Sequence, residues 1–232
     1  MGIHRCIAAL VTVLSVYAAD PSSVMNSKRA ARDSAADTDP GSAFWRDAPA
    51  VVASGDTRGR EVPGHRTEVR SRWTQGNLYF LFICPYEQLY LKPDPHAAEE
   101  TNELWKWDVA EVFVGSDFKD INRYKEFEVS PQGEWVDLDI DLSKPHHEDG
   151  WVWNSGFQPA ARIDAARHVW YCFMRIPWSA IDTRAVATGN QLRINLYYSQ
   201  GPPGAHQGIA WRPTGKPTFH APESFGTLKL VE

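Results

Sequence analysis

Hydrophobic and polar residues alternate over most of the chain beyond residue 66, with the two-residue period of strands that bury one face. The segment 191–198 is typical, because Leu192, Ile194 and Leu196 alternate with Arg193 and Asn195. Alternation or a short apolar run predicts further strands over 67–73, 78–84, 109–114, 124–129, 134–141, 169–176 and 225–231. Short strands separated by Gly and Pro turns predict an all-β fold, an antiparallel β-sandwich of the jelly-roll or immunoglobulin-like type.

Two local connections follow from turn chemistry. Gln75-Gly76-Asn77 separates two of the predicted strands and predicts a β-hairpin over 67–84. The segment 177–181 begins with Pro177, which suits the first position of a helix, and predicts a short helical turn. We therefore expect few helical residues, confined to short turns.

The first 43 residues differ in composition from the rest. Residues 1–18 combine a basic start, an apolar run and small residues before Ala19, which is the pattern of a cleaved signal peptide. The run is too short to span a bilayer, so we expect a secreted or periplasmic protein. Residues 19–43 are rich in Ala, Ser, Asp and Arg without a steady period and predict a linker or N-terminal arm. The β-sandwich domain is predicted over 44–232.

Composition narrows the classes of partner. A net charge of −5 over 232 residues argues against nucleic acid as a binding partner. It also argues against a membrane as a partner once the signal is cleaved. Two cysteines, Cys84 and Cys172, lie beyond the signal, both in apolar strands. Export permits a disulfide between them, but two buried thiols are the preferred interpretation.

The segment 104–115 carries the strongest chemical signal in the chain. Glu111 shares a strand face with Val109 and Phe113, and a carboxylate on such a face needs a partner or a polar ligand. Trp105 precedes it, and Trp107 shares the strand face of Trp105, so one of the two is expected to be buried. An aromatic ring covers the apolar face of a sugar while a carboxylate accepts from its hydroxyls. The simpler interpretation is a core Trp and a Glu paired with Arg.

Other acidic and histidine clusters give weaker signals. Asp137, Asp139 and Asp141 share one strand face and have a spacing that could hold calcium, but a solvated face is the preferred interpretation. The loop 146–149 contains two His and two acidic residues without a second ligand pair, so we expect no metal site there.

Two other functions compete with binding. Glu111, Glu126 and Glu128 could supply the paired carboxylates of a glycoside hydrolase, because Glu126 and Glu128 share a strand face. A haem-binding relative of the same sandwich would need an axial pair, for which Met174 with a His is the only obvious source.

Four segments in this order resemble the family 9 carbohydrate-binding modules and the family-9-like proteins related to them. They are the hairpin 67–80, the strand Leu104–Phe113 with its Trp, Asp and Glu, the strand Tyr124–Val129, and the C-terminal segments Ile209–Trp211 and Phe225–Leu230 with Pro222 between them. The resemblance covers residues 44–232. It implies a β-sandwich that binds a saccharide without catalysis, and a structural calcium ion whose ligands the motifs do not assign; no other cofactor is expected.

The resemblance also implies a sugar site held between two aromatic rings. Trp105 matches one ring, and Phe219 stands where the family has a second Trp. Its polar contacts fall at Glu111, Glu128, Arg193, Asn195 and, beside the second ring, His220. At Glu128 the family can carry Arg, so the charge is reversed here. We expect an oligosaccharide or a plant polysaccharide such as xylan or glucan as the ligand, and a glycoside hydrolase as a partner protein.

Overall fold

A computed structural model describes residues 23–232, so the predicted signal peptide over 1–18 lies outside the described residues. The strands are β1 (Val24–Arg29), β2 (Ala50–Ala53), β3 (Thr67–Trp73), β4 (Asn77–Pro85), β5 (Val109–Gly115), β6 (Arg123–Val129), β7 (Trp135–Asp141), β8 (Gln158–Asp164), β9 (Val169–Pro177), β10 (Gln191–Gln200), β11 (Gln207–Ala210) and β12 (Gly226–Val231). The single α-helix of this region is the short α1 (Trp178–Ile181), where the Pro177 signal predicts it. The all-β prediction is confirmed.

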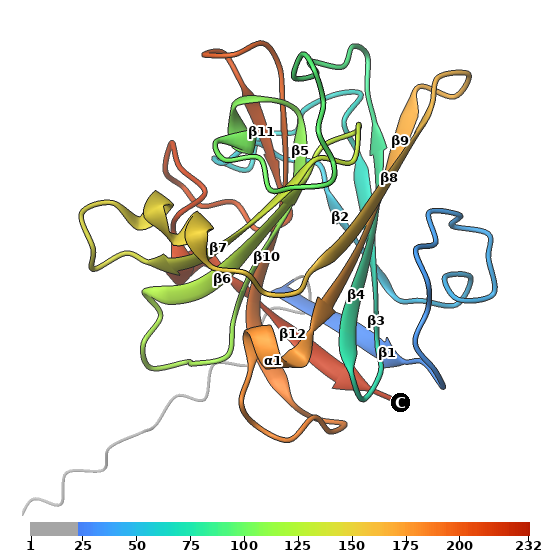
Figure 1. Cartoon of the computed structure of the whole chain (residues 1–232), viewed down its shortest axis with the longest axis vertical. Helices are drawn as coiled ribbons and strands as arrows, with labels where there is room; N and C mark the ends of the chain where they lie inside the picture. The colour runs from blue at the N-terminus through green and yellow to red at the C-terminus, as the bar shows by residue number, and fades with distance from the viewer. Residues whose placement is uncertain (1–22) are drawn as a thin grey trace, which may run out of the picture.

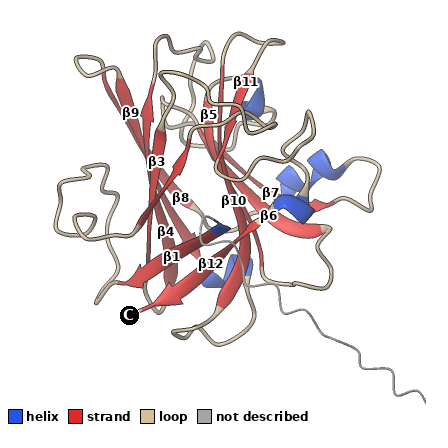
Figure 2. Cartoon of the chain, turned by 180° about the vertical axis from the view of Figure 1, so that it is seen from behind, coloured by secondary structure: helices blue, strands red, loops and turns tan. Residues whose placement is uncertain are grey.

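The strands form one continuous sheet that folds into two layers (Figure 1). Its order is β7-β6-β5-β10-β12-β1-β3-β4-β9-β8, with β11 paired to β10 and β2 to β3. The strands β12 and β1 connect the layer of β5, β6, β7 and β10 to the layer of β3, β4, β8 and β9 (Figure 2). The sheet departs from the antiparallel prediction at β1, which pairs parallel with both β12 and β3. The jelly-roll or immunoglobulin-like subtype stays a prediction.

The N-terminal segment differs from the predicted linker. The strand β1 lies inside the sheet between β12 and β3, so the fold begins by Val24 and not at residue 44. Its sequence VMNSKR is too polar and short for a periodic signal, and parallel pairing on both sides places it in the sheet. The residues after it do behave as an arm, because Trp45 is fully buried against Tyr79 and Phe173 on the outer face of β4 and β9.

The core between the two layers is wholly apolar at its centre. It contains Val112, Phe127 and Leu196 from one layer and Phe80 and Met174 from the other. Cys84 and Cys172 belong to the same core and are free and buried, which confirms the prediction of two buried thiols. No helix in residues 23–232 is long and apolar enough to cross a membrane.

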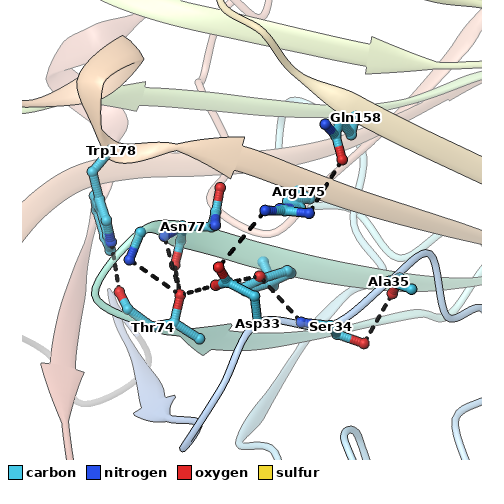
Figure 3. A network of polar contacts seen from close by, with 10 residues as sticks. Asp33, Ser34, Ala35, Thr74, Asn77, Gln158, Arg175 and Trp178 are labelled. Atoms are coloured by element: carbon cyan, nitrogen blue, oxygen red, sulfur yellow. Dashed lines mark hydrogen bonds and ion pairs between the residues drawn. The ribbon is translucent and has the colours of Figure 1, made fainter.

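A compact polar network fastens the arm to the β3–β4 hairpin (Figure 3). The carboxylate Oδ1 of Asp33 accepts hydrogen bonds from the hydroxyls of Thr74 and Tyr79, and its Oδ2 lies 3.7 Å from Arg175. Partial burial raises the pKa of Asp33, but the hydrogen bonds from Thr74, Asn77 and Tyr79 outweigh it and hold that pKa below its ordinary value. Each carboxylate oxygen of Asp33 therefore has a partner.

The far face of β5, β6, β7 and β10 carries a second cluster of buried side chains. Phe113, Leu138, Ile140 and Tyr197 belong to it, so the apolar face of β7 points away from the core between the layers. The row Asp137, Asp139 and Asp141 lies on the opposite face, where Asp137 contacts Ser155, Asp139 contacts Lys125 and Asp141 contacts Ser143. The solvated-face prediction holds for Asp139 alone and is wrong for Asp137 and Asp141, which are buried.

Candidate functional site

A pocket of about 460 Å³ opens on this far face. Its floor comes from successive strands, with Glu111 and Phe113 on β5, Glu126 on β6 and Leu138 on β7. Its rim comes from loops and 3-10 turns and contributes Glu103, Trp105, His147, Glu148, Phe219 and His220. The sheet thus supplies a rigid base with two carboxylates, and the rim supplies aromatic rings. Four of the seven predicted site residues line this pocket: Trp105, Glu111, Phe219 and His220.

Trp105 lies on the 3-10 turn η2 (Leu104–Lys106). The sequence pattern treats this segment as the start of a strand, which is wrong, because Glu103 at its start has a left-handed φ of 62°. Leu104 is fully buried and anchors the turn. Trp105 and Trp107 are both partly exposed, so neither is the buried member of a pair. The turn presents the indole of Trp105 at the rim.

Phe219 is held in a fixed orientation on the other side of the pocket. Its ring stacks on Tyr197 with 4.1 Å between the ring centroids and an angle of 10° between the planes. The Tyr197 hydroxyl donates to the Phe219 carbonyl oxygen at 3.0 Å. The backbone of Gly208 passes so close that a Cβ there would lie 2.6 Å from the Phe219 ring. Only glycine permits this packing, so the ring position is set by three separate contacts.

Asn195 and Arg193, which the sequence predicts as sugar contacts, are not among the residues that line the pocket. The Asn195 side chain is fully buried and donates to the Tyr197 hydroxyl at 2.6 Å and to the Arg212 carbonyl at 2.9 Å. Arg193 donates to the carbonyls of Asp117, Ile121 and Arg123 and so fastens the β5–β6 loop. Both side chains use their donors on the protein, and Asn195 acts through Tyr197 on Phe219.

Three glutamates meet at the pocket floor. Glu111 pairs with Glu128 in the register of β5 and β6, and Glu126 lies two residues earlier on β6, so all three share one face of the sheet. One carboxylate oxygen from each lies within 4.8 Å of the others. Glu128 is fully buried and lies beneath the pocket instead of lining it. We call these three residues the glutamate triad.

The triad is buried with little compensation from hydrogen bonds. Oε2 of Glu126 and both carboxylate oxygens of Glu128 are buried and have no hydrogen-bond partner outside the triad in the described part of the chain, and the contact between Glu126 and Glu128 joins two carboxyl groups. Burial raises the pKa of Glu126 to about 7. Burial and then the neighbouring carboxylates raise the pKa of Glu111 and of Glu128 well above the ordinary value. Buried polar groups in native proteins are normally satisfied, so this triad is suited to a ligand that donates protons or positive charge.

His220 contributes a neutral polar group to the rim. Burial, with His147 beside it, lowers the pKa of His220 to about 4, so the ring is uncharged at neutral pH. Its Nδ1 lies 2.7 Å from the Tyr124 hydroxyl. Burial raises the pKa of Tyr124, which keeps that hydroxyl protonated and makes it the donor to Nδ1. The ring proton of His220 is then on Nε2, where it can donate to an oxygen of a ligand.

The pocket also contains residues that the sequence pattern does not single out as ligand contacts. The sequence predicts Glu126 only as a candidate catalytic carboxylate. It places His147 and Glu148 in a loop that is expected to hold no metal. His147 lies against His220 with 4.4 Å between the ring centroids. The 3-10 turn η3 (His147–Val152) packs on β7 and brings these residues to the rim. No local signal in residues 146–149 specifies that packing.

Comparison with known proteins places this chain in a family. The family described as "Carbohydrate family 9 binding domain-like" matches residues 37–232, and the chain belongs to it. No curated protein matches the chain.

Solved structures of similar fold include two of a family 9 carbohydrate-binding module from Caldicellulosiruptor kristjanssonii. The complex with cellotriose is 12% identical, has a TM-score of 0.63, and the match covers 90% of this chain and 93% of that chain. The complex with glucose is 12% identical with a TM-score of 0.64, and the match covers 89% of this chain and 95% of that chain. A putative carbohydrate-binding protein from Bacteroides uniformis is 16% identical with a TM-score of 0.68, covering 90% and 99%. At these identities the likeness shows the shared fold.

Proposed function

We propose that this protein binds the sugar residues of an oligosaccharide or plant polysaccharide, such as a glucan or xylan, in the pocket between Trp105 and Phe219, and has no catalytic activity of its own. The observation that carries the proposal is the combination in one pocket of two aromatic rings on the rim and carboxylates on the floor. Membership in a carbohydrate-binding family supports the same conclusion.

The pocket chemistry fits a pyranose ring. A volume of about 460 Å³ lies within the range of small-molecule sites, about 300 to 1,000 Å³. The indole of Trp105 and the ring of Phe219 can cover apolar C–H surface. Glu111 and Glu126 accept from hydroxyls, and His220 donates to a sugar oxygen. The site thus offers both kinds of contact that a sugar needs.

A glycan array on the purified protein, followed by calorimetric titration of the best ligand and of cellotriose, tests the proposal. Cellotriose is the first probe because a protein of the same fold was solved with it. We expect one saccharide per protein, with a dissociation constant that Trp105→Ala raises. Absence of binding to every glycan on the array and to cellotriose would contradict the proposal.

The hydrolase alternative is weaker on geometry. Glycoside hydrolases place two carboxyl groups on either side of the scissile bond, about 5 to 9.5 Å apart. The triad oxygens instead lie side by side in one floor, within 4.8 Å of one another, and Glu128 is fully buried. We expect no reducing-sugar release from xylans or glucans. Release that disappears in Glu111→Gln would favour the hydrolase.

The haem alternative requires Met174 as an axial ligand. The side chain of Met174 is fully buried between the two layers of the sheet, among Phe80, Phe127 and other core residues. A ligand in that position would have to displace the core. A Soret band on purified protein would contradict this conclusion.

The signal-like residues 1–18 support export, and we propose that the protein acts outside the cytoplasm, beside a glycoside hydrolase that uses the same polysaccharide. Cleavage after Ala18 would give a mature chain that begins at Ala19. Intact-mass measurement on protein recovered from the periplasm or medium tests this. A full-length mass in that fraction would contradict cleavage.

A further inference from the structure

The glutamate triad has the geometry of a cation site. Calcium–oxygen distances are about 2.3 to 2.6 Å, so any two oxygens bound to one ion lie no more than about 5.2 Å apart. The triad offers one oxygen from each residue within 4.8 Å of the others. The donors are carboxylates alone, without His or Cys, and such a set favours hard cations.

A second observation points to a ligand at this place. Both oxygens of Glu128 lack a hydrogen-bond partner outside the triad in residues 23–232, although its side chain is fully buried. Its neighbours across and along the strands are Glu111 and Glu126, which add like charge. A buried charge is tolerated when it is paired or coordinates a metal. No cationic side chain of residues 23–232 lowers the pKa of Glu128, so a bound cation is the positive partner that fits this position.

We propose that Glu111, Glu126 and Glu128 bind one calcium ion at the floor of the pocket. Glu111 and Glu126 also line the pocket, so the ion has a path from solvent and its open coordination positions face the pocket. Calcium takes six to eight oxygens, more than three monodentate carboxylates supply. Water fills the open positions in the free protein. Two neighbouring sugar hydroxyls replace that water when a saccharide binds, a step that rests on the function proposed above.

The first experiment uses calcium alone. Protein that contains at least residues 23–232 is stripped of metal with EDTA, dialysed and titrated calorimetrically with calcium chloride. Its melting temperature is then measured with and without calcium. We expect one ion per chain, and a rise of about 5 to 10 °C at one hundred times the dissociation constant. A stripped protein that binds no calcium and melts at the same temperature in its presence would overturn the proposal.

Three variants assign the ion to the triad. Glu128→Gln and Glu126→Gln keep the side-chain shape and should lose calcium binding and the thermal shift. Glu99→Gln removes the same charge from an exposed loop residue and should behave as the wild type. Circular dichroism confirms that each variant is folded. Wild-type calcium affinity in both folded triad variants would overturn the assignment.

The second experiment separates the ion from the saccharide. Cellotriose is titrated into wild-type protein in calcium and in EDTA, with at least tenfold weaker binding expected in EDTA. Calcium binding without cellotriose binding in either buffer would overturn the sugar step and leave the ion site supported. Equal cellotriose affinity in both buffers would overturn the coordination of sugar by the ion and leave the saccharide site supported.

Discussion

The carboxylate of Asp33 and those of the glutamate triad differ in whether the fold supplies them with hydrogen-bond partners. Asp33 accepts from Thr74 and Tyr79 and faces Arg175, so each of its oxygens has a partner. The glutamate triad is more deeply buried, yet both oxygens of Glu128 and one of Glu126 have none outside the triad in the described chain. The two groups are also shifted oppositely, since the pKa of Asp33 is lowered and the pKa of each triad member is raised.

The contrast separates a stabilising cluster from a binding one. A hydrogen-bonded carboxylate such as Asp33 contributes to folding, because its partners stabilise the charged form. An unpartnered buried carboxylate costs stability. The triad lies at the floor of a pocket with aromatic rings on its rim, which supports the proposal that a ligand completes it. Substitutions in the two groups should therefore have effects of opposite sign.

The largest expected effect is on saccharide affinity at the rim. Trp105→Ala removes an indole that would cover about 50 to 100 Å² of apolar sugar surface, or about 1.3 to 2.5 kcal/mol at 25 cal/mol per Å². The dissociation constant for cellotriose should rise about ten- to seventyfold. Trp105 is partly exposed, so the melting temperature should change little. Wild-type affinity for cellotriose in this variant, measured by calorimetry, would show that Trp105 does not contact the saccharide.

Phe219→Ala should have a smaller effect on affinity and a clearer effect on stability. The phenyl ring covers less sugar surface than an indole, and we expect about three- to tenfold weaker cellotriose binding. The variant also loses the stacking on Tyr197, which is worth about 0.5 to 1.5 kcal/mol. Thermal melts should therefore fall by about 1 to 6 °C. A Phe219→Ala protein with wild-type melting would show that the stack does not hold this rim.

Glu128→Gln should raise stability when calcium is absent. The amide keeps the shape of the side chain and removes a carboxyl group whose charged form burial destabilises, a gain of about 1 kcal/mol. In EDTA the melting temperature should rise by about 2 to 4 °C relative to the wild type. A fall of the same size would show that the carboxylate is satisfied in the free protein, and the contrast with Asp33 would be lost.

Asp33→Asn should lower stability, with the smallest effect of the series. Asp33 is half-exposed, so solvent screens its ion pair with Arg175, and the loss of hydrogen bonds to a charged acceptor should cost about 0.5 to 1 kcal/mol. The lowered pKa fixes the sign of the pH dependence, because the stabilisation is present above the unfolded pKa of about 3.9 and is lost as pH falls through the folded pKa. Thermal melts at pH 7 and at pH 3 test this. A difference from the wild type that persists undiminished at pH 3 would contradict it.

The sequence predicts the long strands because their pattern is local. The strands β3, β6, β7 and β10 alternate, β5 and β9 are apolar runs, and each lies within a few residues of its predicted bounds. It misses β1, β2, β8 and β11, which are short or polar. β1 becomes a strand through pairing with β12, which is distant in sequence, and the other three through pairing with the strands next to them along the chain. Local propensity does not encode that pairing.

In the candidate site, too, the sequence predicts what is local and misses what depends on the path of the chain. Trp105 and Glu111 stand out in the sequence as an aromatic residue near an isolated carboxylate. Arg193 and Asn195 lie on the same sheet face, but their donors are taken by backbone carbonyls of loops whose path the sequence does not reveal. The grouping of Glu126 with Glu111 follows from strand register, and the arrival of His147 at the rim follows from a turn that packs on β7.

In our proposal the glutamates at the pocket floor serve binding while Asp33 serves folding. Calorimetric titration of cellotriose in calcium into Glu111→Gln and Asp33→Asn, side by side with the wild type, tests it most directly. We predict at least tenfold weaker binding for Glu111→Gln, because a charge-assisted contact worth about 1.5 to 3 kcal/mol is lost, and wild-type affinity for Asp33→Asn. Wild-type affinity in Glu111→Gln would contradict the account.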